Sequence, residues 1–319
     1  MKAREESIEL SIIIPLLNEE GNILTLYNEL KDVISYLGLT NEILFIDDGS
    51  SDKSLNIIKK LAQKDTAVKG ISLSRNFGHQ IALTAGLKYS IGNIVITMDA
   101  DLQHPPKTIK ELYFKYIEGF DIVNTIRKDS QDIGFIKKTT SKGFYRLINN
   151  LSETYTQPAA ADFRLMSRKT VNAFLELPEK DRFTRGLISW MGFKQTFVNY
   201  EAPKRFSGES KYSFIKMFHF AKDGITSFSA KPLRISFYIG LFISFIGFTY
   251  GVYAVIRFFN GHTQPGWTSI LLSVLIIGGI QLISIGIIGE YLARVYKESK
   301  NRPLYFVKEF IQVNHEELF

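Results

Sequence analysis

The sequence predicts an α/β domain built on a mainly parallel sheet, followed by two membrane-spanning helices and a short tail. Strand and helix patterns alternate over roughly the first 125 residues, which is typical of a parallel sheet with helices on both faces. Two stretches near the C-terminus, 235–256 and 268–289, each hold 22 residues without a charge. Two carboxylates follow one buried strand directly. The chain, at 319 residues, is long enough for more than one domain.

The expected elements follow from the spacing of apolar residues. Short apolar runs predict strands at 9–15, 42–47, 68–73, 94–98 and 121–125. Helical spacing predicts helices at 23–37, 80–89 and 112–117, and Ser51 is expected to cap another helix after the second strand. The α/β domain is therefore expected to cover residues 1–211.

The two uncharged stretches predict membrane helices at about 235–257 and 267–290, within a membrane region at 233–294. About 20 apolar residues, rising 1.5 Å each, cross a hydrocarbon core of about 30 Å. Two buried helices of a soluble protein are the alternative, but both stretches are apolar on all sides. The connection at 257–266 has only ten residues, so the helices form a hairpin whose ends share one side of the membrane.

Charge distribution predicts on which side those ends lie. Basic residues flank the hairpin on the side of the chain termini: Lys231, Arg234, Arg294, Lys297, Lys300 and Arg302. The connection offers only Arg257 and His262, so both termini are expected in the cytoplasm and the tail at 295–319 with them. No signal peptide is evident, and the absence of cysteine suits a reducing compartment.

The net charge of +7 is concentrated close to the membrane region. Residues 212–232 interleave aromatic and basic side chains, which predicts a juxtamembrane helix lying in the interface; packing under the catalytic domain is the alternative. Such a basic segment favours anionic lipid headgroups over nucleic acid, for which the chain carries no binding motif.

Asp99 and Asp101 come directly after the apolar run at 94–98, and Pro105 ends the segment. Ligands of open α/β sheets bind at the carboxyl ends of the strands. Two carboxylates there can hold Mg²⁺ or Mn²⁺ whose remaining positions are filled by substrate phosphates. A solvated, Asp-rich loop is the alternative for an isolated Asp-x-Asp.

Polar side chains follow all of the first four strands. They are Asn18 and Glu19, Asp47 and Asp48, Arg75 and Asn76, and Asp99 and Asp101. Together they predict a crevice of nucleotide size, in which Asp48 accepts a hydrogen bond from a base. Farther along, Arg205 and Lys211 flank Gly208, which suits a mobile loop that clamps phosphates.

These residues form recognisable motifs. They are Ile14-Pro-Leu-Leu-Asn-Glu-Glu20, Asp47-Asp-Gly-Ser50, Ser74-Arg-Asn-Phe-Gly78, Asp99-Ala-Asp-Leu-Gln-His-Pro105, Asp162-Phe-Arg-Leu165 and Arg205-Phe-Ser-Gly-Glu-Ser-Lys-Tyr212. In this order, over about two thirds of the chain, they resemble family 2 glycosyltransferases of the GT-A fold. The branch is that of dolichyl-phosphate-mannose synthases and GtrB-like bactoprenol glucosyltransferases. The hairpin, ending in Gly289-Glu-Tyr-Leu-Ala-Arg294, resembles the two-span bacterial members.

The resemblance implies a role for each matching residue. Nucleotide binding falls to Pro15, Asn18, Glu19, Asp48 and Arg75. The metal diphosphate falls to Asp99, Asp101 and Gln103, the reacting sugar to Asp162, the donor phosphates to Arg205 and Lys211, and the acceptor phosphate to Arg127 and Lys142. Residues 131–136 depart from the glycine-rich stretch of the family, and Lys142 stands where arginine is common.

The resemblance further implies an inverting transferase that moves glucose from UDP-glucose onto polyprenyl (undecaprenyl) phosphate at the cytoplasmic face of the membrane. A GDP-mannose-dependent mannosyltransferase is the alternative within the branch. A processive polysaccharide synthase would require a Gln-x-x-Arg-Trp motif, which the stretch at 185–190 does not supply. A non-catalytic scaffold is disfavoured because Asp101, Asp162 and the 205–211 clamp are all present.

Two further expectations concern Asp162 and self-association. A lipid phosphate has a second pKa of about 6, so it is largely dianionic at neutral pH and needs no general base. We therefore expect Asp162 to orient the sugar or a neighbouring cation and to stabilise charge at the anomeric carbon. Glycines at 278–279, 286 and 289 offer small surfaces for a homo-oligomer of the membrane helices.

The charge asymmetry makes the topology testable, because the chain contains no cysteine and accepts single ones cleanly. A cysteine replacing Thr263 should react with a membrane-impermeant thiol reagent added outside intact cells. A cysteine replacing Asn301 should react only after lysis, which serves as the matched control. The reversed pattern would place both termini outside.

Overall fold

The computed structural model describes residues 8–128, 160–180, 182–201, 229–260 and 266–312. The described residues form two compact units. The first holds the residues up to 201 together with those from 302 onward, and the second holds those from 229 to 301. Each unit is considered by itself below.

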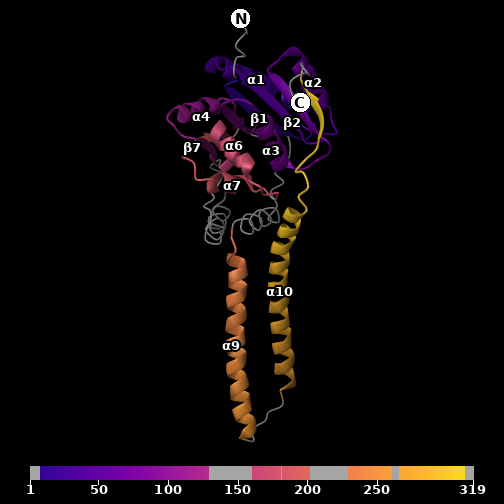
Figure 1. The fold of residues 1–319 in the computed structure, drawn as a ribbon, viewed down its shortest axis with the longest axis vertical. Helices are drawn as coiled ribbons and strands as arrows, with labels where there is room; N and C mark the ends of the chain where they lie inside the picture. The colour runs from indigo at the N-terminus through magenta and orange to yellow at the C-terminus, as the bar shows by residue number, and fades with distance from the viewer. Residues whose placement is uncertain (1–7, 129–159, 181, 202–228, 261–265, 313–319) are drawn as a thin grey trace. The chain divides into compact units, whose positions relative to one another are not determined.

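The first unit is built on one sheet of eight strands, in the order β7-β5-β6-β4-β1-β2-β3-β8 (Figure 1). The strands are β1 (Leu10–Leu16), β2 (Asn41–Asp47), β3 (Val68–Leu73), β4 (Ile94–Thr97), β5 (Ile122–Lys128), β6 (Ala160–Ser167), β7 (Gln195–Glu201) and β8 (Val307–Ile311). Its helices are α1 (Ile23–Leu37), α2 (Ser54–Lys64), α3 (His79–Tyr89), α4 (Thr108–Ile117), α6 (Arg168–Glu176) and α7 (Thr184–Trp190).

Strand direction places the polar strand ends at one edge of the sheet. β1 pairs in parallel with both β2 and β4, and β2 pairs in parallel with β3, so these four strands end on the same side. The chain moves outward from β1 through β2 to β3, then returns to β4 on the other side of β1. This reversal is the topological switch point at which α/β sheets bind ligands.

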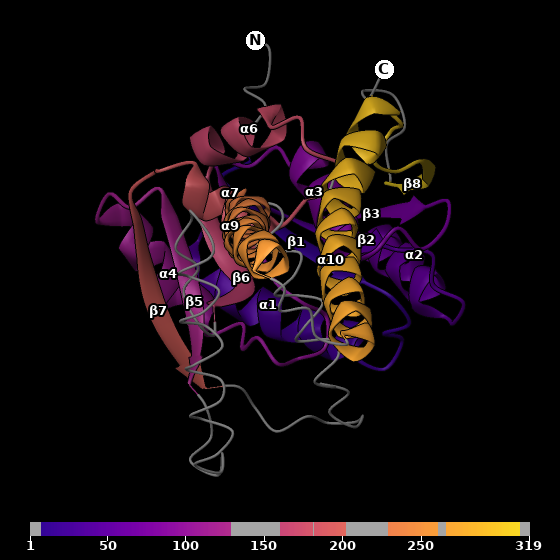
Figure 2. The ribbon, with the colours of Figure 1, turned by 90° about the horizontal axis from the view of Figure 1, so that it is seen from below.

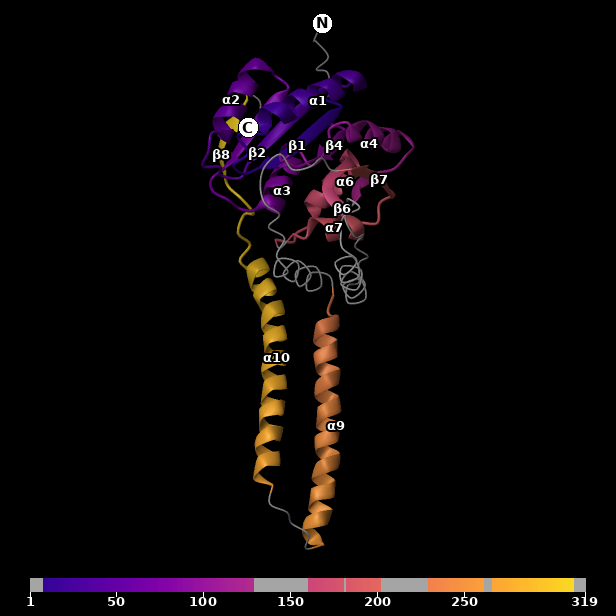
Figure 3. The same cartoon turned by 180° about the vertical axis from the view of Figure 1, so that it is seen from behind.

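Helices cover both faces of the sheet, as the alternating pattern predicts (Figures 1 and 3). The even-numbered apolar residues of β1, from Leu10 to Leu16, belong to the core cluster that contains the buried face of α1. Ile13 points to the other face, where α3 lies so close that a Cβ on Gly86 would collide with the Ile13 side chain. Glycine at 86 therefore lets α3 sit directly on β1.

The expected strands and helices are all present, with shifts of a few residues at their ends. The capping prediction for Ser51 was wrong: α2 begins at Ser54, whose N–H donates to the Asp52 carboxylate at 2.9 Å. The Ser51 N–H instead donates to Asn18 Oδ1 at 2.8 Å. Ser51 is held by the loop after β1, which is more than 30 residues away in the sequence, so local spacing could not predict this contact.

The segment expected to be a tail contributes a strand. β8 pairs antiparallel with β3 at the sheet edge (Figure 2). Ile311 is buried against Gly70, the Phe310 ring lies 5.2 Å from that of Tyr89, and Glu309 Oε1 lies 2.7 Å from Lys59 Nζ. The five residues of β8 alternate too weakly between apolar and polar to be predicted as a strand. Their burial depends on β3, which precedes them by more than 230 residues.

The second unit consists of α9 (Lys231–Phe259) and α10 (Trp267–Ser299), two helices that run side by side (Figures 1 and 3). Ser236 Oγ donates to Ser284 Oγ at 2.7 Å between them. Stretches of 23 and 24 residues, Lys231–Tyr253 and Ile276–Ser299, are long and apolar enough to cross a membrane, and none of their most apolar windows is buried. Large exposed apolar side chains along both helices call for a lipid environment. The expected interfacial segment lies, up to residue 228, outside the described residues.

The edge strand gives a stability prediction. Ile311→Ala removes a buried side chain packed on Gly70, and such truncations cost about 2–4 kcal/mol. We expect a lower midpoint of thermal unfolding for the purified full-length protein. Lys308→Ala, an exposed position on the same strand, is the matched control and should leave the midpoint unchanged. Equal midpoints for both variants would show that β8 contributes nothing to stability.

Candidate active site

The loops after β1 and β2 are joined by side-chain hydrogen bonds. Asn18, in the left-handed backbone region at φ 56°, donates its N–H to Ser50 Oγ at 2.9 Å. Its side-chain oxygen accepts from Ser51, and the Glu19 N–H donates to Ser54 Oγ at 2.9 Å. Pro15 is buried within β1. The structure thus brings Asn18 and Glu19 together at the strand ends and gives Asn18 a role in joining two loops.

Asp48 joins the loops after β2 and β3. Its two carboxylate oxygens accept the N–H groups of Phe77 at 2.7 Å and Gly78 at 2.8 Å. Burial raises the pKa of Asp48, against the effect of these hydrogen bonds. A base bound here would therefore share a carboxylate that already holds the start of α3. Sequence alone assigned Asp48 to the base and missed this backbone contact.

The same two loops approach so closely that only glycine fits at position 49. Gly49 has φ 80°, and a Cβ on it would lie 2.8 Å from the backbone carbon of Arg75. The Arg75 guanidinium lies over the Phe77 ring at 4.1 Å and donates to the Asn76 carbonyl at 3.0 Å. Arg75 is exposed in the loop after β3, and its role in nucleotide binding stays a prediction.

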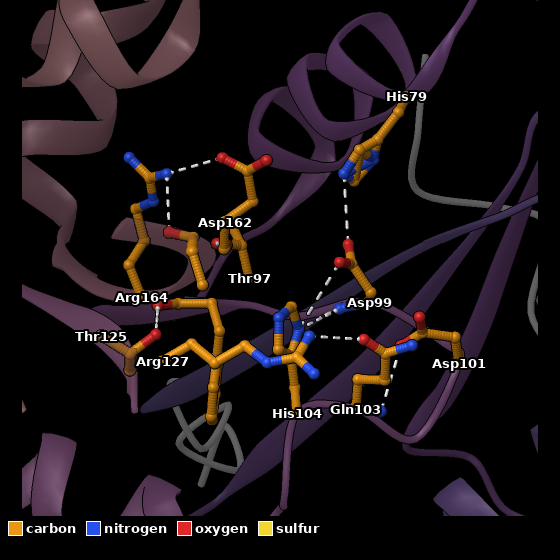
Figure 4. A network of polar contacts seen from close by, with 12 residues as sticks. His79, Thr97, Asp99, Asp101, Gln103, His104, Thr125, Arg127, Asp162 and Arg164 are labelled. Carbon is orange, nitrogen blue, oxygen red and sulfur yellow. Dashed lines mark hydrogen bonds and ion pairs between the residues drawn. The ribbon is translucent and has the colours of Figure 1, made fainter. Parts of the chain in front are cut away.

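The turn after β4 is organised by His104. Its Nδ1 accepts the Asp99 N–H at 3.0 Å, and its ring stacks on Phe163 at 5.1 Å (Figure 4). Burial lowers the pKa of His104 to about 4, so the ring is neutral and its 3.7 Å approach to the Asp99 carboxylate is no ion pair. The Gln103 N–H closes the turn on Asp101 Oδ1 at 3.1 Å. His104 thus supports Asp99, and the Gln103 backbone holds Asp101.

The surroundings of Asp99 and Glu19 disfavour the ionised forms of these two carboxyl groups. Burial raises the pKa of Asp99 to about 6, although the His79 Nε2 atom of α3 lies 3.2 Å from its carboxylate (Figure 4). Burial also raises the pKa of Glu19, and the charges of Asp101 and Asp99 add to the effect. Hard oxygen ligands whose charge needs compensation suit Mg²⁺ or Mn²⁺. The described residues contain no group of three or more His, Cys, Asp or Glu that could hold a metal ion.

Gln103 and Arg127 contact each other, although the family resemblance assigns Gln103 to the metal diphosphate and Arg127 to the acceptor phosphate. Arg127 Nη1 donates to Gln103 Oε1 at 2.8 Å (Figure 4). Gln103 is buried, whereas Arg127 is exposed at the end of β5. For Gln103 to bind a metal through Oε1, that oxygen would have to give up or share this bond. The contact places the expected acceptor-phosphate residue beside the carboxylate turn.

Asp162 lies at the centre of a buried charge cluster. β6 pairs antiparallel with β4, which brings Asp162 next to Thr97, whose hydroxyl donates to the Asp162 carbonyl at 2.6 Å. Arg164 Nη2 donates to Asp162 Oδ1 at 2.7 Å, while Arg185 of α7 donates through Nε to Oδ1 at 3.1 Å and through Nη2 to Oδ2 at 3.0 Å. Gln80 of α3 approaches Oδ2 at 3.4 Å. Four donors thus surround one carboxylate.

The cluster fixes the protonation state of Asp162. Burial alone would raise its pKa, but the charges of Arg185 and Arg164 outweigh burial and hold the pKa of Asp162 well below its ordinary value. A carboxylate so stabilised is a poor proton acceptor. That Asp162 is not a general base stays a prediction, which this lowered pKa supports.

Several residues of this site were not predicted. Arg185, His79, His104, Gln80 and Thr97 all contact the expected catalytic or metal residues. His104 lies within the Asp99–Pro105 motif and could have been chosen for that reason. Arg185 stood in the stretch tested only for a polysaccharide-synthase motif. Of the expected residues, Lys142, Arg205 and Lys211 lie outside the described residues.

Asp162→Asn removes the charge that the buried Arg164 requires, and breaking such a pair costs about 3 kcal/mol or more. An unfolded Asp has a pKa of about 3.9, and the folded pKa is lower. The stabilisation is therefore complete above about pH 4 and is lost as the pH falls through the folded pKa. Denaturant unfolding of both proteins should show a full difference at pH 7 that shrinks below about pH 4. A difference that does not depend on pH would contradict the ion-pair explanation.

"Glycosyl transferase family 2" matches residues 11–175, just over half of the 319-residue chain, and "GtrB C-terminal hairpin" matches residues 231–295. The chain is 45% identical over 304 residues to an uncharacterized glycosyltransferase of Synechocystis, covering 95% of this chain and 96% of the relative. It is 41% identical over 302 residues to the bactoprenol glucosyl transferase of Shigella phage SfV, covering 94% and 98%.

A solved structure of glucosyl-3-phosphoglycerate synthase from Mycobacterium tuberculosis, in complex with Mn²⁺, UDP and phosphoglyceric acid, is 20% identical and covers 69% of this chain and 76% of that chain at a TM-score of 0.45. The expected fold class, a GT-A-like α/β domain with a C-terminal two-helix hairpin, is confirmed, and the protein is membrane-associated. The match over half of the chain, with relatives along nearly all of it, shows that this glycosyltransferase belongs to glycosyl transferase family 2.

Proposed function

We propose that the protein is an inverting glycosyltransferase that moves glucose from UDP-glucose onto a polyprenyl phosphate at the cytoplasmic face of the membrane. The observation that carries this proposal is the group of carboxylates and arginines around the ends of β1 to β4, on a chain with two membrane-length helices. The relative named bactoprenol glucosyl transferase, matched along 94% of this chain, supports the sugar and the lipid.

Donor binding is assigned to the strand ends. The joined loops around Asn18 and Asp48 would hold the nucleoside, and Asp99 and Asp101 would hold a divalent cation. The cation supplies compensation for the charge of the departing nucleoside diphosphate. The raised pKa of Asp99 supports this assignment, since a bound cation would favour its ionised form.

The acceptor provides its own nucleophile. A phosphate monoester with a second pKa of about 6 is largely dianionic at pH 7, so its oxygen attacks the anomeric carbon without a protein base. Arg127, exposed and hydrogen-bonded to Gln103, is placed to orient this phosphate next to the carboxylate turn. Membrane anchoring keeps the enzyme at a high effective concentration of a lipid that does not leave the bilayer.

The proposal is tested by incubating the purified protein in lipid nanodiscs with polyprenyl phosphate and a panel of labelled nucleotide sugars. We expect a polyprenyl-phosphate-glucose product from UDP-glucose, identified by mass spectrometry. If only GDP-mannose gives a lipid product, the transferred sugar is mannose and not glucose. Labelled lipid in none of the reactions would refute it.

The same assay tests the metal assignment. Chelator should abolish transfer, and added Mg²⁺ or Mn²⁺ should restore it. Asp101→Asn should reduce turnover about 100-fold or more, the magnitude found when a key electrostatic group is removed. Asp32→Asn, an exposed carboxylate on α1, is the control and should keep full activity. Full activity in chelator would exclude the metal role.

A further inference from the structure

We propose that Arg185 is a phosphate-binding residue of this enzyme and that Asp162 serves as its anchor. This inference rests on the proposed function and deepens it by adding a cation that the family motifs did not supply. The ligand chemistry is a phosphate oxygen, which belongs either to the donor diphosphate or to the lipid phosphate.

The orientation of the Arg185 side chain is fixed by a two-point contact. Nε and Nη2 donate to the two different oxygens of Asp162 at 3.1 and 3.0 Å. This fork geometry is stronger and more directional than a single bond, and it engages two of the five N–H donors of a guanidinium. Asp162 itself is held by Arg164 and by the Thr97 bond to its carbonyl. Arg185 is therefore attached to the sheet through a rigid carboxylate.

Of the two arginines on Asp162, only Arg185 presents surface to a ligand. Its side chain is 29% exposed, whereas that of Arg164 is 2% exposed. Arg164 already balances the charge of Asp162. Arg185 brings a second positive charge to this cluster, and it is the arginine whose side chain reaches solvent.

Arg185 also lies close to the catalytic turn. Gln80 of α3 approaches Asp162 Oδ2, the same oxygen to which Arg185 Nη2 donates, and the neighbouring residue His79 lies 3.2 Å from the Asp99 carboxylate. A phosphate bound to a cation on Asp99 and Asp101 would therefore have Arg185 nearby. Arginine is the side chain best suited to such a phosphate contact.

In this assignment the arginine contacts the ligand and the carboxylate positions the arginine. With four donors around its two oxygens, Asp162 has little capacity left to accept from a sugar hydroxyl or to take a proton. Its contribution to transfer would then pass through Arg185. Asp162→Asn and Arg185→Ala should consequently impair the same binding step.

The experiment uses the full-length protein in nanodiscs and two separate readouts. Calorimetric titration of UDP in the presence of Mn²⁺ reports on the donor phosphates, and the KM for polyprenyl phosphate in the transfer assay reports on the acceptor. Arg185→Ala should raise one of these two constants about tenfold or more. Arg185→Lys, which keeps the charge but loses the fork, should give an intermediate value. Lys169→Ala, which removes an exposed cation paired with Asp121, should change neither constant.

The affected constant identifies the ligand. A weaker UDP titration with unchanged KM for the lipid assigns Arg185 to the donor diphosphate, and the opposite result assigns it to the lipid phosphate. Unchanged constants in Arg185→Ala, even with a lower kcat, would overturn the inference while the proposed function stands. A wild-type protein that neither binds UDP nor transfers sugar would instead defeat the proposed function itself. Thermal unfolding of each variant verifies that it is folded.

Discussion

The position of β1 between two parallel neighbours is the constraint on which the rest of the site depends. Because β2 and β4 both run parallel to β1, the loops that follow all three strands leave the sheet at the same edge. The loops after β1 and β2 hold one another through Asn18 and Ser51, and the loops after β2 and β3 are joined by the carboxylate of Asp48 and the backbone at Phe77. Hydrogen bonds between loops, rather than regular secondary structure, thus give the crevice its shape.

The second determinant of the site is the antiparallel insertion of β6 between β4 and β5. It brings Asp162 and Arg164 next to Thr97, two residues before Asp99, and turns both charged side chains to one face. Burying this pair is costly unless every donor and acceptor is matched. Arg185 adds a further donor pair and a net positive charge. The carboxylate turn and the arginine cluster then place opposite charges side by side, which suits a ligand that carries phosphates and a cation.

The two units suit different environments, water for the first and lipid for the second. The first buries its apolar residues in a core between sheet and helices, whereas the second exposes large apolar side chains along two helices. An α-helix pairs its interior backbone groups within itself, which a lipid environment requires. β8, which follows α10 in the chain, covers the edge of β3 and prevents that edge from pairing with other chains.

The sequence by itself determined the elements with strong periodicity, the hairpin, and the residues at the strand ends, including Asp99 and Asp101. Local patterns suffice there, because burial of a long apolar run depends little on which partner covers it. Only the tertiary structure decided that 307–311 forms an edge strand, that Ser51 binds Asn18, and that Arg127 meets Gln103. The contact between Arg185 and Asp162 joins residues 23 positions apart on different elements. Such contacts depend on strand order and register, which no local sequence pattern encodes. The partners of these residues are therefore known only from the tertiary structure.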